Sequence, residues 1–150
     1  MDEVDWKILR ILQESPQISA VELADQVALS HTPCWRRVKR MEELGVIRER
    51  AIILDSRKVD RAISVFAHIR LKQHDEETLD AFERVTSERP EIVDCFSMSG
   101  ESDYLLRVVV RNVDEYESLL RTTLLHLPGL ASINSSFALK CVKNTTRLPI

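Results

Sequence analysis

Glycine and cysteine are scarce in this 150-residue sequence, which contains three of each. So little glycine argues against a protein built mainly of loops or around a phosphate-cradling glycine motif. The cysteines, Cys34, Cys95 and Cys141, lie far apart and form no C-x-x-C pair. We interpret them as small core residues rather than metal ligands or nucleophiles. An odd number of unpaired cysteines is more typical of a reducing cytoplasm than of secretion.

Long apolar runs and catalytic patterns are also missing. The apolar runs are much shorter than the roughly 20 residues that cross a bilayer, and the charged N-terminus is unlike a signal peptide. The four histidines are scattered, and no Ser/His/Asp set, metal-ligand spacing or phosphate loop is present. We therefore expect a globular cytoplasmic protein with no membrane partner, no metal, no cofactor and no catalytic residues. An enzyme is the remote alternative.

One segment is strongly basic although the net charge is −3. Between Ser30 and Arg40 there are four basic residues and no acidic residue. Phosphate contact needs only a basic patch, because only the charges that face DNA displace counterions. The alternative is the ordinary solvated face of an amphipathic helix.

Three short helices are predicted before residue 46. Apolar residues recur at helical spacing over 4–14, and the sequence S-A-V-E at 19–22 is a capping box that starts a second helix. A third helix starts at Ser30 or Thr32, has Pro33 in its first turn, and ends near Gly45. The tight turn between the last two helices predicts a helix-turn-helix that binds DNA, in a winged-helix-like domain.

The third helix would be the recognition helix. If Cys34 and Val38 face inward, its N-terminal residues approach base edges and its basic residues contact phosphates. Trp35 can contact a sugar or a thymine methyl group, or it can pack in the core, which we slightly favour. The candidate DNA-binding residues are Ser30, His31, Thr32, Trp35, Arg36, Arg37, Lys39 and Arg40.

A linking segment follows the helices. Residues 46–54 are predicted to be an extended linking strand, in which Arg48 and Arg50 either contact phosphate or are solvated, and residues 55–61 are the candidate linker. We therefore divide the chain into a DNA-binding domain at 1–47, a linking strand and linker at 48–61, and a C-terminal domain at 62–150.

The C-terminal domain is predicted to have the order βαββαβ. Apolar alternation predicts strands at 65–71, 92–98, 104–110 and 133–139. Helices are predicted at 76–88 and after the capping residue Asn112, and Pro90 and Pro128 follow them. This is a ferredoxin-like plan, so the whole chain has an α+β fold. Its helices cover one face of the sheet, and the open face is a candidate dimerisation surface.

The chain resembles the Lrp/AsnC (feast/famine) family of transcription regulators over essentially its whole length. Four stretches carry the resemblance: V-D-W-K-I-L-R-I-L-Q, L-S-H-T-P-C-W-R-R-V-K-R-M-E-E-L-G-V-I, S-G-E-S-D-Y-L-L-R-V and S-S-F-A-L-K-C-V-K-N-T-T-R-L-P-I. The second and third are the specific ones. The resemblance implies a DNA-binding regulator that forms homodimers, often assembled further into octamers.

The resemblance also implies an amino-acid effector bound near the hairpin between the middle strands. A glycine turn offers N–H groups to the effector carboxylate, and Asp103 or Glu101 suits its ammonium group. Alternatively, Asp103 bonds the local backbone and Gly100 only supplies a positive φ. An architectural DNA-binding protein without an effector is the other alternative. The candidate effector-binding residues are Met98, Ser99, Gly100, Glu101, Asp103, Tyr104, Ser135, Ser136 and Phe137.

Overall fold

The computed structural model describes residues 1–150 as two compact units. The first unit contains residues 1–53 together with residues 143–150, and the second contains residues 54–142. No helix in either unit is long and apolar enough to cross a membrane.

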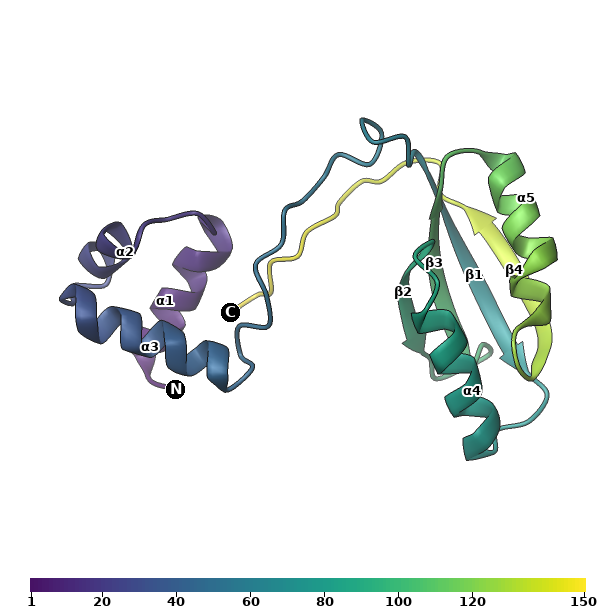
Figure 1. Ribbon diagram of the computed structural model, residues 1–150, viewed down its shortest axis with the longest axis horizontal. Helices are drawn as coiled ribbons and strands as arrows, with labels where there is room; N and C mark the ends of the chain where they lie inside the picture. The colour runs from purple at the N-terminus through teal and green to yellow at the C-terminus, as the bar shows by residue number, and fades with distance from the viewer. The chain divides into compact units, whose positions relative to one another are not determined.

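The first unit contains the three predicted helices, α1 (Glu3–Glu14), α2 (Ala20–Gln26) and α3 (His31–Glu43) (Figure 1). Each helix is amphipathic and buries its apolar stripe in a shared core. That core contains Ile8, Leu9, Leu23, Ala24, Val27, Cys34, Val38 and Met41.

Local sequence signals fix the ends of these helices. The capping box at Ser19 is present, because the Ser19 side chain accepts from the Glu22 N–H while Glu22 accepts from the Ser19 N–H. Ala28 adopts a φ of 54° in the tight turn between α2 and α3. Gly45, with a φ of 70°, ends α3 in the left-handed conformation predicted for it.

The predicted linking strand at 46–54 does not form. The segment has no ladder partner and is irregular, with Ile52 and Ile53 largely exposed. A strand needs neighbouring backbone groups to bond with, and apolar alternation alone does not supply them.

The second unit is built on one antiparallel sheet of four strands in the order β2-β3-β1-β4. Its elements along the chain are β1 (Ile63–Leu71), α4 (Glu76–Ser87), β2 (Ile92–Ser97), β3 (Tyr104–Val110), α5 (Val113–Thr122), the 3-10 helix η1 (Leu124–His126) and β4 (Leu130–Phe137). The predicted βαββαβ order is confirmed. The last strand ends earlier than predicted, because Leu139 lies beyond it and is almost fully exposed.

One face of the sheet carries the core. Val65, Ala67 and Ile69 of β1 pair with Val108, Leu106 and Tyr104 of β3, and all six side chains are buried. Because side chains alternate along a strand, these residues share one face, and Phe82 of α4 and Tyr116 of α5 pack against them. Figure 1 shows the helices α4 and α5 beside this sheet.

The opposite face of the sheet has no covering helix. By the same register it carries one row of Asp94, Arg107, Phe66 and Ser136, and a second row of Phe96, Leu105, His68 and Asn134. Arg107 is ion-paired with Asp94 across the strands. Phe96 is more than half exposed, so this face leaves apolar area open to a partner.

Gly129 shapes the turn into β4. Its φ is +67°, and a Cβ atom there would lie 2.3 Å from Cγ2 of Thr78 on α4. Its carbonyl accepts from the Lys72 N–H at 2.8 Å. The position therefore needs glycine both for its backbone conformation and for the close approach of α4.

Candidate functional site

The exposed face of α3 carries the basic residues singled out in the sequence. Lys39 is ion-paired with Glu42 at 2.6 Å, and its ammonium group lies 5.9 Å from the centre of the Trp35 ring. The Trp35 side chain is 49% exposed. The slight preference for packing Trp35 in the core was therefore wrong, because the inward positions of α3 are filled by Cys34, Val38 and Met41.

A buried carboxylate holds two of the arginines. Asp5 of α1 is fully buried, and it accepts hydrogen bonds from Arg37 at 2.8 Å and from Arg40 at 2.7 Å. Arg37 also bonds to Asp2 at 2.7 Å. Asp5 and Asp2 cap α1 reciprocally, since each side chain accepts from the other's backbone N–H. These four residues, the Asp5 cluster, tie the start of α1 to α3.

The hydrogen bonds keep the carboxylates of the Asp5 cluster ionised. Burial pushes the pKa of Asp5 upward, but the bonds from Arg37 and from the Asp2 backbone outweigh it, so the pKa lies below its ordinary value. The pKa of Asp2 is also lowered, mainly by the Asp5 backbone N–H and by Arg37. Arg37 is thus a fixed cation in a fixed orientation.

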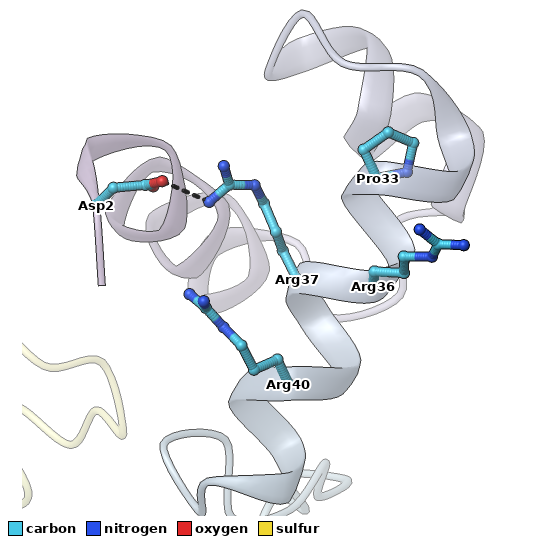
Figure 2. A pocket seen from close by; sticks show the side chains of 5 residues that line it. All are labelled: Asp2, Pro33, Arg36, Arg37 and Arg40. Atoms are coloured by element: carbon cyan, nitrogen blue, oxygen red, sulfur yellow. Dashed lines mark hydrogen bonds and ion pairs between the residues drawn. The ribbon is translucent and has the colours of Figure 1, made fainter.

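The surface beside this cluster is an open depression of about 370 Å³, lined by Asp2, Pro33, Arg36, Arg37 and Arg40. Figure 2 shows Arg37 pointing toward Asp2, the N-cap residue of α1, whereas Arg36 points the other way, on the side of Pro33. Carboxylates hold Arg37, Lys39 and Arg40, but Arg36 has no such partner within the chain. It is the most freely available guanidinium on α3.

The N-terminal end of α3 is also accessible. Ser30, His31 and Thr32 are exposed, and Ser30 is the N-cap although its side chain makes no capping hydrogen bond. The Ser30 hydroxyl is thus left free to bond with another molecule.

The hairpin between β2 and β3 is held by Asp103. One carboxylate oxygen accepts from the Leu71 N–H at 2.7 Å, and the other lies 2.8 Å from Nε2 of His74. The Leu71 N–H and His74 lower the pKa of Asp103. Both oxygens therefore connect the hairpin to the end of β1.

The tip of the hairpin is exposed. Gly100 has a φ of +119°, which favours glycine. Met98, Ser99 and Glu101 are exposed around it, and the Glu101 carboxylate has no hydrogen bond or ion pair within the chain. The Met98 N–H donates to the Asp103 carbonyl at 2.9 Å and closes the hairpin.

The remaining sequence-predicted residues lie on β3 and β4. Tyr104 is only 3% exposed: its ring packs on Phe82, and its hydroxyl donates to Glu83 at 2.6 Å. Tyr104 is thus a core residue and not an accessible effector-binding side chain as predicted, because its place in β3 turns it toward the helices. On β4, the Ser135 hydroxyl bonds to Tyr116 at 2.5 Å, and the exposed Phe137 ring contacts Tyr116 edge-on.

Comparison with known proteins assigns a family to each part of the chain. Residues 1–48 match the model of a winged helix-turn-helix DNA-binding domain, and residues 64–148 match the Lrp/AsnC ligand binding domain. The chain belongs to the Lrp/AsnC family of transcription regulators. This confirms the resemblance and the α+β fold.

Relatives of this Lrp/AsnC protein align along its full length. It is 39% identical to the Bkd operon transcriptional regulator of Pseudomonas aeruginosa, with all of this chain and 98% of the relative aligned. It is 37% identical to the DNA-binding transcriptional activator DecR of Escherichia coli, with 100% and 99% aligned.

Solved structures of the Lrp/AsnC family agree with the fold. An AsnC family regulator from Agrobacterium tumefaciens is 46% identical, with a TM-score of 0.93 and coverage of 99% of this chain and 97% of that one. A transcriptional regulator of Neisseria meningitidis, solved in complex with L-Met, is 35% identical, with a TM-score of 0.93 and coverage of 99% and 96%.

The structure brings together part of each residue set predicted for this Lrp/AsnC protein. The DNA-binding candidates lie on one exposed side of α3 or, for Arg37 and Arg40, at its junction with α1. Most effector candidates lie at the hairpin tip or at the end of β4, whereas Asp103 bonds to the end of β1 and Tyr104 is in the core. Asp2 and Asp5 were not among the predicted residues, although an acidic pair three residues apart at a helix start is a signal for a second capping box.

Proposed function

We propose that this protein is a transcription regulator that binds specific duplex DNA through α3 and responds to an amino acid bound by its second unit. The observation that carries this proposal is the exposed basic face of α3, placed directly after a tight helix-helix turn. The names of the relatives support both halves of the proposal, since they include transcriptional regulators and a regulator in complex with L-Met.

We infer separate roles on DNA for the residues of α3. Arg36 is free to form a bidentate contact with guanine, while Ser30, His31 and Thr32 approach base edges at the start of the helix. Arg37 and Arg40 are held by the Asp5 cluster and offer their remaining N–H groups to phosphates. Lys39 can give up its exposed ion pair with Glu42 and contact a phosphate instead. This costs little free energy, because such surface pairs contribute little stability. Trp35 contacts the sugar edge beside them.

Selection of duplexes from a random pool tests this role, followed by anisotropy titrations on the enriched sequence. Arg36→Ala should weaken binding to that sequence by about 1–3 kcal/mol while leaving weak binding to random DNA nearly unchanged. Arg121→Ala, an exposed arginine on α5, is the matched control. Enrichment of no sequence, or equal losses on both DNAs, would contradict base reading by Arg36.

For the effector, we infer that Glu101 accepts the ammonium group, because both oxygens of Asp103 are already engaged. The exposed N–H groups at Ser99 and Gly100 suit the carboxylate. Met98, with Ser135, Ser136 and Phe137 of a neighbouring subunit, would complete the site, while Tyr104 supports it from the core.

A thermal-shift screen against the twenty amino acids tests this site. An effector at about 100 times its Kd stabilises the native state by about 2.7 kcal/mol, which corresponds to several degrees. The shift should disappear in Glu101→Ala and persist in Glu117→Ala, a solvated glutamate on α5. A flat screen would favour the architectural alternative, a DNA-binding protein without an effector.

We also propose that two copies pair through the open face of the sheet, and that such dimers assemble further, for example into octamers. Phe66, Phe96 and Leu105 supply the apolar area. Leu105→Glu should reduce the mass measured by light scattering, whereas Leu125→Glu, on the exposed side of η1, should not. A monomeric wild-type protein at micromolar concentration would disprove this pairing.

The regulator role also bears on the protein's location in the cell and on catalysis. We propose a cytoplasmic protein without catalytic activity, because its relatives are regulators of transcription and its proposed partner is DNA. A duplex-dependent function needs no metal or cofactor.

A further inference from the structure

The last residues of the sequence lie against α1 and belong to the first unit, although residues 54–142 separate them from it. We call Lys143–Ile150 the returning segment. The Leu148 N–H donates to Oε1 of Gln13 at 2.6 Å, and the Leu148 carbonyl accepts from Nε2 of Gln13 at 3.2 Å. Nε of Arg10 donates to the Ile150 carbonyl at 3.1 Å. In Figure 1 the yellow end of the chain lies beside the purple α1.

The chemistry of these contacts is that of backbone recognition. A glutamine amide can accept from the N–H and donate to the carbonyl of one residue at once, as a neighbouring strand would. Pro149 favours an extended conformation at Leu148, which presents both groups to Gln13. The Leu148 side chain is 69% exposed, so the surface on α1 holds the main chain and not the leucine side chain.

Arg10 and Gln13 are three residues apart, so their side chains lie on one face of α1. The helix uses Ile8 and Leu9 for its core, and Asp5 for its link to α3. The face with Arg10 and Gln13 is thus separate from the surface assigned to DNA, and the returning segment of the same chain occupies it.

We propose that this face of α1 is a docking site for the returning segment of the same chain, and that the docked segment is a second tether on the DNA-binding unit. The first tether is the irregular stretch after α3. The second begins at β4, the strand that carries Ser135, Ser136 and Phe137, so it connects the inferred effector region with α1. The tethering role rests on the proposed function, whereas the docking itself does not.

Hydrogen exchange of the full-length protein tests the docking. Gln13→Ala removes both bonds to Leu148 and should speed exchange of the Leu148 amide by about 2- to 12-fold, the factor that one modest hydrogen bond supplies. Leu148→Ala should keep the protection, because only main-chain atoms are held. Gln26→Ala, an exposed glutamine on α2, is the control and should change nothing.

DNA binding tests the tether. With wild-type protein, selection yields a duplex with two half-sites, from which a single half-site duplex is made. Loss of one tether enlarges the volume that each DNA-binding unit samples, so Gln13→Ala should weaken binding to two half-sites on the order of fivefold and leave the single half-site unchanged. Deletion of residues 143–150 should have the same effect as Gln13→Ala.

The outcomes separate the two claims. Unchanged exchange at Leu148 in Gln13→Ala overturns the docking site. Faster exchange with unchanged binding to two half-sites overturns the tether while leaving the docking in place. If wild-type protein enriches no duplex, the proposed function fails, and exchange at Leu148 still decides whether the segment docks.

Discussion

Replacement of Asp5 by asparagine is the most informative perturbation of the first unit. Asp5 accepts bonds from Arg37, Arg40 and the Asp2 N–H, and it is completely buried. Breaking a buried ion pair typically costs 3–5 kcal/mol. Here both arginines are partly exposed, at 29% and 53% of their side chains, and water compensates part of the loss. We therefore expect Asp5→Asn to lower the free energy of unfolding by about 3 kcal/mol.

The distribution of aromatic residues provides a selective assay for this change. Both tryptophans, Trp6 and Trp35, lie in the first unit, and both tyrosines, Tyr104 and Tyr116, lie in the second. Urea unfolding followed by tryptophan emission therefore reports the first unit, and tyrosine emission measured separately reports the second.

The expected result is an earlier tryptophan transition with an unchanged tyrosine transition. With a slope of about 1 kcal/mol per molar urea for so small a unit, the midpoint should fall by about 3 M. Asp25→Asn, an exposed aspartate on α2, should change the free energy of unfolding by less than about 0.5 kcal/mol. A loss below about 1 kcal/mol in Asp5→Asn would refute the view that this carboxylate holds α1 to α3.

Three further predictions concern pH and the second unit. Because the pKa of Asp5 is lowered on folding, its stabilisation is present above the ordinary value of 3.8 and is lost as pH falls below it; acid titration of tryptophan emission should show this loss, and Asp5→Asn should flatten it. Gly129→Ala should destabilise the second unit by at least about 1–2 kcal/mol in calorimetry, and adding Thr78→Ser, which removes the clashing methyl group, should recover only part of that loss. Asp103→Ala should cost about 1–3 kcal/mol because it leaves the Leu71 N–H unpaired, seen as an earlier tyrosine transition; no loss would mean that the carboxylate does not support the hairpin.

The elements of both units were predictable because each is amphipathic in its own sequence. Helical spacing located α1, and alternation located β1 and β3 with boundaries close to those observed. The capping box at Ser19 and the left-handed Gly45 were also predictable, since they depend only on neighbouring residues.

Contacts between distant residues were not predictable in this way. Asp5 has the pattern of an exposed acidic residue in a first helical turn, and only the arginines of α3 explain its burial. Tyr104 alternates correctly in β3, but the alternation alone does not say which face meets the helices. The returning segment has no periodic pattern, because its contacts use main-chain atoms.

The return of residues 143–150 to α1 makes the second unit an insertion within the first. After a single proteolytic cut between residues 54 and 61, Leu148 and the main-chain groups that bond to Gln13 are on the larger fragment, not on the fragment that carries the helix-turn-helix. Excision of the DNA-binding unit for study in isolation requires two junctions, at 53/54 and 142/143. A peptide covering only residues 1–53 lacks part of the unit, and supplying residues 143–150 as a separate peptide would restore it by complementation.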